Sequence, residues 1–116
     1  MSSHRPRKRF GQHFLHDQSV IWRIVEAIAP MPDQNLVEIG PGQGALTRPL
    51  LSRAGKLSVI EIDRDLAGEM ERDLGPEGVE VIAVDALNHD FVQMGRDVGP
   101  LRIVGNLPYN ISTPLI

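Results

Sequence analysis

Short apolar segments that alternate with helical patterns constrain the fold of this chain more than any other feature. The sequence predicts strands over 36–39, 57–62, 79–84 and 101–104. Helical patterns precede, separate and follow them, at 17–28, 45–53, 63–74 and 89–94 and from Ser112 onward. Strands that alternate with helices are typical of a parallel sheet. We therefore expect an α/β fold of the doubly wound, Rossmann-like kind, with helices flanking a parallel sheet that is truncated after about four strands.

Glycine, acidic and aromatic residues follow these strands directly. The segments concerned are Gly40–Gly44, Glu61–Asp63, Asp85 and Asn106–Tyr109. Right-handed crossovers bring the carboxyl ends of parallel strands to one edge, where ligands usually bind. We expect these four segments to meet there and to form the functional site.

The glycine segment has the form E-x-G-x-G-x-G. Gly40, Gly42 and Gly44 allow the backbone to turn tightly and to approach a ligand without a Cβ in the way. The next helix then directs its N-terminal N–H groups at that ligand. The same spacing also satisfies the dinucleotide fingerprint, so an NAD oxidoreductase remains an alternative, as does a tight turn without a ligand.

Three acidic residues favour S-adenosylmethionine as the cofactor. Glu38, just before the loop, suits a ligand with a cationic amino acid end better than a pyrophosphate. Glu61 can accept both ribose hydroxyls. Asp85 can accept a hydrogen bond from the adenine amino group, with Ala86 and Leu87 beside the ring. The alternatives are a solvated surface acid at Glu61 and a helix cap at Asp85.

The segment Asn106-Leu107-Pro108-Tyr109 indicates the acceptor. It resembles the [D/N]-[L/P]-P-[Y/F/W] motif of methyltransferases that modify exocyclic amines of bases. The Asn106 side-chain oxygen and the Leu107 or Pro108 carbonyl can accept the two amine hydrogens and stabilise the positive charge that grows on nitrogen. Tyr109 can stack on the extruded base. A Pro-Tyr turn without function is the alternative.

The charge of the chain is unevenly distributed. Residues 1–30 carry five basic and two acidic side chains, a net +3, whereas residues 31–116 carry seven and thirteen, a net −6. The basic residues Arg5, Arg7, Lys8 and Arg9 fit an arm that contacts RNA phosphates, although a solvated terminus would carry the same charge. The chain has no cysteine and no apolar run of membrane-spanning length. We expect a cytoplasmic protein that uses no membrane and no metal.

Together these segments resemble the ribosomal RNA adenine dimethyltransferase family, most closely its bacterial small-subunit branch. The resemblance runs from Arg7 onward through 9–15, 38–44, 59–63 and 105–112. It implies a class I methyltransferase fold. It also implies S-adenosylmethionine-dependent N6,N6-dimethylation of two adjacent adenines in a hairpin near the 3′ end of 16S ribosomal RNA. The partner would be the small ribosomal subunit or its precursor, and the protein would be a monomer.

The resemblance also assigns residues and domains. It implies cofactor contacts at His13, Leu15, Gly40, Glu61, Asp85 and Asn106. His13 is a departure, because the family commonly has Asn there. We expect a basic, cofactor-contacting segment over 1–16 and the N-terminal part of the methyltransferase domain over 17–116. The family's later strands and helical RNA-binding domain would follow Ile116, so this stretch alone is expected to be inactive. A large-subunit ribosomal RNA adenine methyltransferase and a non-catalytic RNA-binding relative remain alternatives.

Overall fold

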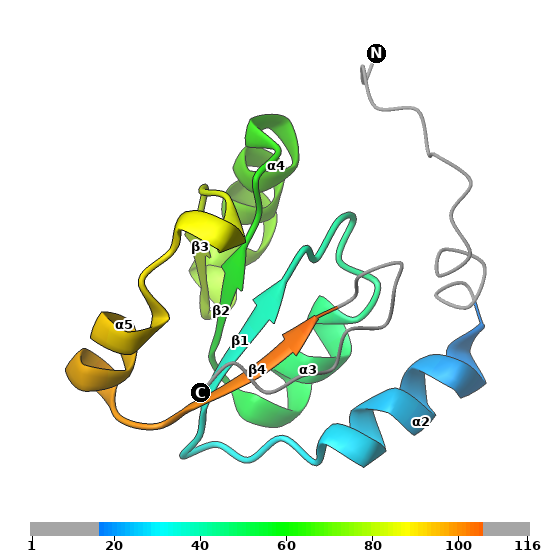
Figure 1. Cartoon of the computed structure of the whole chain (residues 1–116). Coiled ribbons are helices and arrows are strands. Elements are labelled where there is room, and N and C mark those ends of the chain that lie inside the picture. Colours follow the sequence, from blue (N-terminus) through cyan, green and yellow to red (C-terminus); the bar gives the residue numbers. More distant parts are fainter. Residues whose placement is uncertain (1–16, 106–116) are drawn as a thin grey trace.

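A parallel sheet with helices on both faces forms the described part of the chain, residues 17–105 of this computed structural model (Figure 1). The strands are β1 (Asn35–Ile39), β2 (Leu57–Ile60), β3 (Val79–Ile82) and β4 (Leu101–Gly105). Their order is β3-β2-β1-β4, and each neighbouring pair is parallel. The predicted α/β architecture with a parallel sheet is confirmed.

The helices begin at the polar residues that the sequence indicates. Asp17 caps the first helix by accepting a hydrogen bond from the Ser19 backbone N–H, and Asp63 caps the third in the same way. Both caps were predicted and are confirmed. The elements are α2 (Gln18–Ile28), α3 (Thr47–Ala54), α4 (Arg64–Leu74) and α5 (Phe91–Val98), with 3-10 turns η1 (Gly75–Glu77) and η2 (Ala86–Asn88).

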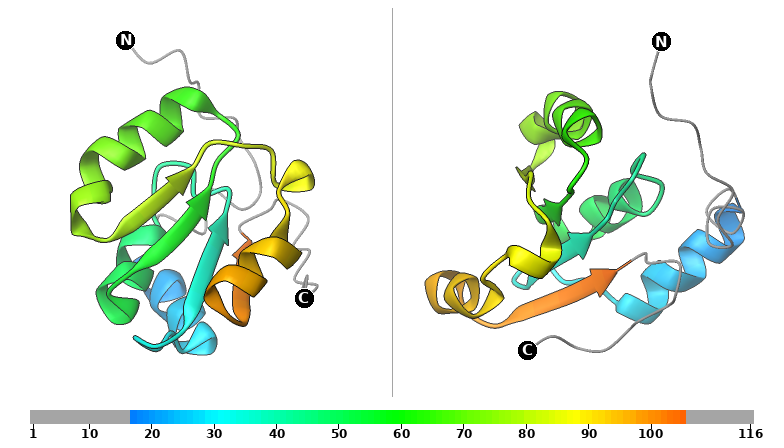
Figure 2. Two further views of the ribbon diagram at one scale, coloured as in Figure 1. Left: turned by 90° about the vertical axis from the view of Figure 1, so that its left-hand side faces the viewer. Right: turned by 45° about the horizontal axis from the view of Figure 1, so that its top comes forward.

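The main core lies between one face of the sheet and helices α2, α3 and α4. Val25 of α2 and Leu50 of α3 are fully buried there against Val59 of β2. Burial of one such aliphatic side chain contributes roughly 1.5–3 kcal/mol, so this cluster holds the three helices in place. Figures 1 and 2 show α5 on the side of the sheet away from α2 and α3.

The strand order places β1 at the point where the topology reverses. The chain moves from β1 outward to β2 and β3, and then returns to place β4 on the other side of β1. The arrowheads of β1 and β4 point the same way in Figure 1. In open α/β sheets, ligands bind outside the carboxyl ends of the strands at such a reversal. The carboxyl ends of β1 and β4 therefore flank the expected ligand crevice.

Two strands are shorter than predicted. The sequence predicts strands over 57–62 and 79–84, but β2 ends at Ile60 and β3 at Ile82. After β2 the chain turns directly into the cap of α4. After β3 the Val84 backbone N–H donates to the carbonyl of Ile82, only two residues earlier, over 3.1 Å. This tight turn removes the backbone from the extended conformation that a strand requires.

Helix α5 also starts later than predicted. The pattern predicts a helix over 89–94, whereas α5 begins at Phe91 and extends to Val98. Asp90 sets this start, because its side chain accepts a hydrogen bond from the backbone N–H of Gln93 over 2.9 Å. An N-cap residue lies outside the helix that it caps, so the residues before Asp90 are excluded from α5.

Candidate functional site

The loop after β1 has the backbone conformation that its glycines allow. Gly40, Gly42 and Gly44 have φ values of 69°, 58° and 90°, in the left-handed region that other residues rarely adopt. The Gly40 N–H donates to the carbonyl of Ile60 in β2 over 2.9 Å, and the Gly44 N–H donates to that of Pro41 over 2.9 Å. The loop is therefore a defined turn fixed to the sheet.

No part of residues 17–105 covers the first half of this loop. A Cβ added at Gly40 or at Gly42 would meet no atom of those residues within 4 Å. At Gly44 a Cβ would lie 3.3 Å from the Met70 Cε of α4, so this glycine packs against the protein instead. The loop thus presents bare backbone on one side and is supported by α4 on the other, which fits a ligand that must approach the backbone closely.

Glu61, directly after β2, lies against the glycine loop. It is 6% exposed, so the alternative of a solvated surface acid is wrong. Its Oε1 accepts a hydrogen bond from the Gly42 N–H over 3.2 Å, and its Oε2 accepts one from the Asp63 N–H over 3.0 Å. A carboxylate oxygen can accept two hydrogen bonds, so both oxygens keep capacity for ligand hydroxyls.

Glu38 of β1 is fully buried. The hydroxyl of Thr47, the first residue of α3, donates to Glu38 Oε1 over 2.6 Å, while Glu38 Oε2 has no hydrogen-bond partner among the described residues. Burial raises the pKa of Glu38 to about 7; the Thr47 hydrogen bond opposes this shift, and the negative charge of Glu61 adds to it. Glu38 is therefore a carboxyl group whose charge is costly to maintain near neutral pH.

Asp85 follows β3 and caps the turn η2. Its Oδ1 accepts a hydrogen bond from the Leu87 N–H over 2.9 Å, so the helix-cap alternative is observed. This contact uses one oxygen and leaves the other for a further donor. Ala86 is partly buried, while the Leu87 side chain is 92% exposed. The expected place of Ala86 and Leu87 beside an adenine ring stays a prediction.

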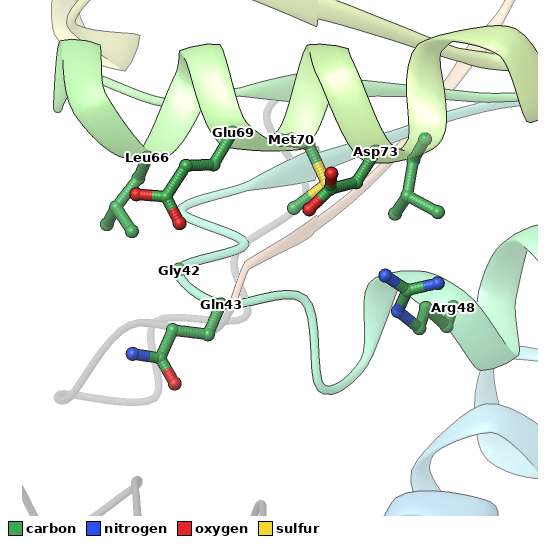
Figure 3. Close-up of a pocket in the computed structure, with 8 residues that line it drawn as sticks. Gly42, Gln43, Arg48, Leu66, Glu69, Met70 and Asp73 are labelled. Carbon is green, nitrogen blue, oxygen red and sulfur yellow. The ribbon is translucent and has the colours of Figure 1, made fainter.

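A small cavity lies between the glycine loop and α4, and Figure 3 shows its lining. Its volume is about 160 Å³. Ligand pockets are typically about 300 Å³ or more, so this cavity alone is too small for a nucleoside cofactor. Arg48 of α3 lies on one wall and Glu69 and Asp73 of α4 on the other. Neither Glu61 nor Asp85 lines it, so it borders the predicted site without forming it.

Several predicted site residues lie outside the described part of the chain. They are the basic residues Arg5, Arg7, Lys8 and Arg9, the cofactor candidates His13 and Leu15, and the acceptor segment Asn106, Leu107, Pro108 and Tyr109. The described part of the chain ends at Gly105 of β4, which pairs in register with Ile39 of β1. In the sequence, Gly40 follows Ile39 and Asn106 follows Gly105.

Two negative findings apply to residues 17–105 only. No group of three or more His, Cys, Asp or Glu side chains in that range could hold a metal ion. No helix in that range is long and apolar enough to cross a membrane.

Two contacts of the site were not predicted from the sequence. The hydrogen bond between Thr47 and Glu38 joins a helix start to a strand, and the one between Gly42 and Glu61 joins loops that are 19 residues apart. The dinucleotide fingerprint expects an acid about 20 residues after the glycines, but it does not specify a hydrogen bond between the two. Each contact depends on how the helices pack on the sheet. The sequence did indicate the two acids themselves, Glu38 before the glycine loop and Glu61 after the next strand.

Comparison with known proteins matches residues 3–116 to the model of a family described as ribosomal RNA adenine dimethylase. A protein of Bordetella avium named ribosomal RNA small subunit methyltransferase A is 58% identical over 116 residues, which are all of this chain and 43% of that protein. A protein of the same name from Aeromonas hydrophila is 59% identical over 115 residues, or 97% of this chain and 42% of that protein. The chain thus spans less than half the length of these relatives.

Solved structures give the same result for the fold. The 23S rRNA methyltransferase ErmE superposes with a TM-score of 0.66 and 34% identity, covering 83% of this chain and 38% of that one. A dimethyladenosine transferase from Plasmodium falciparum superposes with a TM-score of 0.64 and 30% identity, covering 83% and 34%. The sheet and its helices are those of Rossmann-like methyltransferases.

Proposed function

We propose that the full-length protein methylates adenine N6 in ribosomal RNA with S-adenosylmethionine as methyl donor. The premise is that this chain belongs to the ribosomal RNA adenine dimethylase family. The observation that carries the proposal is the contact between Glu61 and Gly42. It joins the acid expected to bind ribose to the glycine loop, so the fold itself holds these two parts of the expected cofactor site together. Binding groups that the fold holds in place lower the ordering cost of binding.

The described residues would bind the cofactor in three parts. The bare backbone of Gly40 and Gly42 admits close approach of the amino acid portion. The remaining acceptor capacity of Glu61 suits the two ribose hydroxyls. The free oxygen of Asp85 suits the adenine amino group. Gly44 and Ala86 complete the set, Gly44 through its packing on α4 and Ala86 beside the ring. Glu38, which was expected to suit the amino acid end, is fully buried and would act on the cofactor only through the loop.

His13 and Leu15 are proposed as further cofactor contacts from the segment that precedes α2. His13 stands where the family commonly has Asn. A neutral imidazole can still donate one hydrogen bond and accept another. We therefore keep the proposed role, with a ring nitrogen in place of the amide group.

The acceptor amine would be held by the segment after β4. When bound, S-adenosylmethionine would supply an electrophilic methyl group to the N6 lone pair, with the carbon–sulfur electrons left on sulfur and the surplus N6 proton released to water. Asn106 and the carbonyl of Leu107 or Pro108 would accept the amine hydrogens and stabilise its growing positive charge. Tyr109 would stack on the base. The pairing of Gly105 with Ile39 supports this proposal, because the strands that lead to Asn106 and to Gly40 end side by side.

The proposed substrate is 16S ribosomal RNA in the small subunit or its precursor, at two adjacent adenines of a hairpin near its 3′ end. The names of the relatives that are 58% and 59% identical support this choice. Arg5, Arg7, Lys8 and Arg9 would contact its phosphates. We further propose that the protein acts as a cytoplasmic monomer and that the segment over 1–16 belongs to the cofactor site.

The test is transfer of tritium from labelled S-adenosylmethionine by the full-length protein. Under-methylated small subunits are compared with large subunits, because the resemblance to a 23S rRNA methyltransferase makes the large subunit the second candidate. We expect label in 16S RNA, at two methyl groups on each of two adenines. Label in the large subunit alone would assign the protein to the other branch. An absence of transfer by a folded, cofactor-binding protein would contradict methylation of ribosomal RNA.

A further inference from the structure

The side chains of Glu38 and Thr47 meet across the two ends of the glycine loop. Glu38 lies near the end of β1 and Thr47 is the first residue of α3, so the whole loop lies between them. Both residues are 0% exposed, and the Thr47 hydroxyl donates to Glu38 Oε1 over 2.6 Å. A hydrogen bond between the strand that enters a loop and the helix that leaves it restrains the distance between the loop ends.

The start of α3 has little other side-chain support. Its N-cap residue is Leu46, which makes no side-chain cap hydrogen bond. Pro49, in the first turn, has no backbone N–H to donate. The backbone contributes a 3.3 Å hydrogen bond from the Arg48 N–H to the carbonyl of Gly44. At helix starts of this kind a capping side chain usually fixes the first turn. Here the bond between Thr47 and Glu38 takes that place.

A carboxyl group is a costly choice at this position. Glu38 pairs in register with Val59 on one side and Val104 on the other, so an apolar residue would suit the surrounding strands. Its Oε2 is buried without a hydrogen-bond partner among the described residues, and a buried polar atom that lacks a partner lowers stability. Costly polar groups in cores are often retained because they specify one arrangement of the chain. The arrangement specified here is that of the loop ends.

We infer that Glu38 is a positioning residue for the cofactor loop, which it holds through Thr47. A side chain with no exposed surface does not reach a ligand at the edge of the sheet. It acts on the ligand by fixing the first turn of α3 and the loop from Gly40 to Gly44. This inference rests on the proposed function, since it assumes that the loop receives S-adenosylmethionine.

The first experiment removes the Thr47 hydroxyl from the full-length protein. Thr47→Val keeps the shape of the side chain, and Thr47→Ser keeps the hydroxyl. Calorimetric titration measures the affinity for S-adenosylhomocysteine. We expect T47V to weaken binding about tenfold and T47S to restore most of it. The matched control is Ser58→Ala, because Ser58 makes the same kind of hydrogen bond to Glu80, over 3.2 Å, on an exposed part of the sheet. S58A should bind as the wild type does.

A double-mutant cycle then separates positioning from direct contact. Glu38→Leu and T47V remove the same hydrogen bond, so their effects on S-adenosylhomocysteine affinity should not multiply. The affinity of the double variant should lie within about threefold of that of the single variant that binds more weakly. Losses that multiply in the double variant would mean that Glu38 acts on the ligand independently of Thr47, and would overturn the inference.

The double variant is also the test to use if T47V alone fails to fold. T47V leaves the Glu38 Oε1 buried without its donor, whereas the double variant has no carboxyl group at this position. Wild-type affinity in the double variant would overturn the inference while leaving the proposed function intact. A wild-type protein that binds no S-adenosylhomocysteine would instead overturn the proposed cofactor, and the inference with it.

Discussion

The Glu61 carboxylate accepts a hydrogen bond from the backbone N–H of Gly42 over 3.2 Å, although the two residues belong to different loops. The other Glu61 oxygen accepts one from the Asp63 N–H. Two backbone donors therefore point at the two oxygens of one buried side chain. The loop after β1 and the loop after β2 share this carboxylate, so a change at Glu61 disturbs both.

Glu61→Gln should therefore be more harmful than its similar shape suggests. A glutamine has one amide nitrogen, so one of the two backbone N–H groups would face a second donor. We expect S-adenosylhomocysteine affinity to fall about 10- to 100-fold, or roughly 1.4–2.8 kcal/mol. Calorimetric titration measures this loss. The matched control is Glu71→Gln, on the exposed face of α4. Equal S-adenosylhomocysteine affinities for E61Q and E71Q would show that Glu61 does not contribute to cofactor binding.

Gly44→Ala should destabilise the protein more than Gly40→Ala. Both glycines have positive φ values, but only at Gly44 would a Cβ also press on the Met70 Cε. A strained backbone position of this kind costs about 1–3 kcal/mol, and the Met70 contact adds to this at Gly44. Thermal unfolding of the full-length variants compares them. A lower midpoint for G40A than for G44A would contradict the packing described for the loop.

The stability of the protein should depend on pH through Glu38. Its pKa is raised in the folded state from an ordinary 4.5 to about 7, so the folded state holds this proton more tightly than the unfolded state does. The stabilisation from the bound proton is present below about pH 4.5 and is lost as the pH rises toward 7. Each pKa unit corresponds to about 1.4 kcal/mol, so the loss amounts to roughly 3 kcal/mol.

Glu38→Gln cannot ionise and should lack this loss. Urea unfolding of the wild type and of E38Q between pH 5 and pH 8 measures the difference, and the wild type should become less stable relative to E38Q as the pH rises. Parallel stability curves would mean that Glu38 does not titrate in this range.

Asn106→Ala should reduce methyl transfer at least about 100-fold, which is the usual cost of removing one group that stabilises developing charge. The loss should appear mainly in kcat, because Asn106 is proposed to act on the amine as positive charge develops. Single-turnover transfer to under-methylated small subunits provides the measurement, and circular dichroism checks the fold. Near-normal turnover would remove Asn106 from its proposed role.

The sequence predicted the type and order of the elements because these depend on local patterns. Asp17 and Asp63 cap the helices that they were expected to cap, since a capping side chain reaches only two or three residues ahead. The parallel sheet followed from strands that alternate with helices. The early ends of β2 and β3 were not predictable, because apolar residues such as Ile62 and Val84 continue the pattern although the backbone has turned.

The site was predicted as a set of residues but not as a set of contacts. Glu61 was expected to bind a ligand or to face solvent, and both readings missed that it first binds the Gly42 backbone. Thr47 carried no signal at all, because a Thr at the start of a helix is ordinary. Such contacts depend on the packing of α3 and β2 against β1, which no single segment of sequence specifies.

The pairing of β1 with β4 has a consequence for the order of folding. Asn35 at the start of β1 donates a side-chain hydrogen bond to the carbonyl of Val98, 63 residues later, as the chain enters β4. Contacts between such distant residues close a large loop, and they tend to form late because that closure is entropically costly. During synthesis, β1, β2 and β3 can assemble while β4 is still inside the ribosome. The junction between the carboxyl ends of β1 and β4 therefore forms later than the part of the sheet made by β1, β2 and β3.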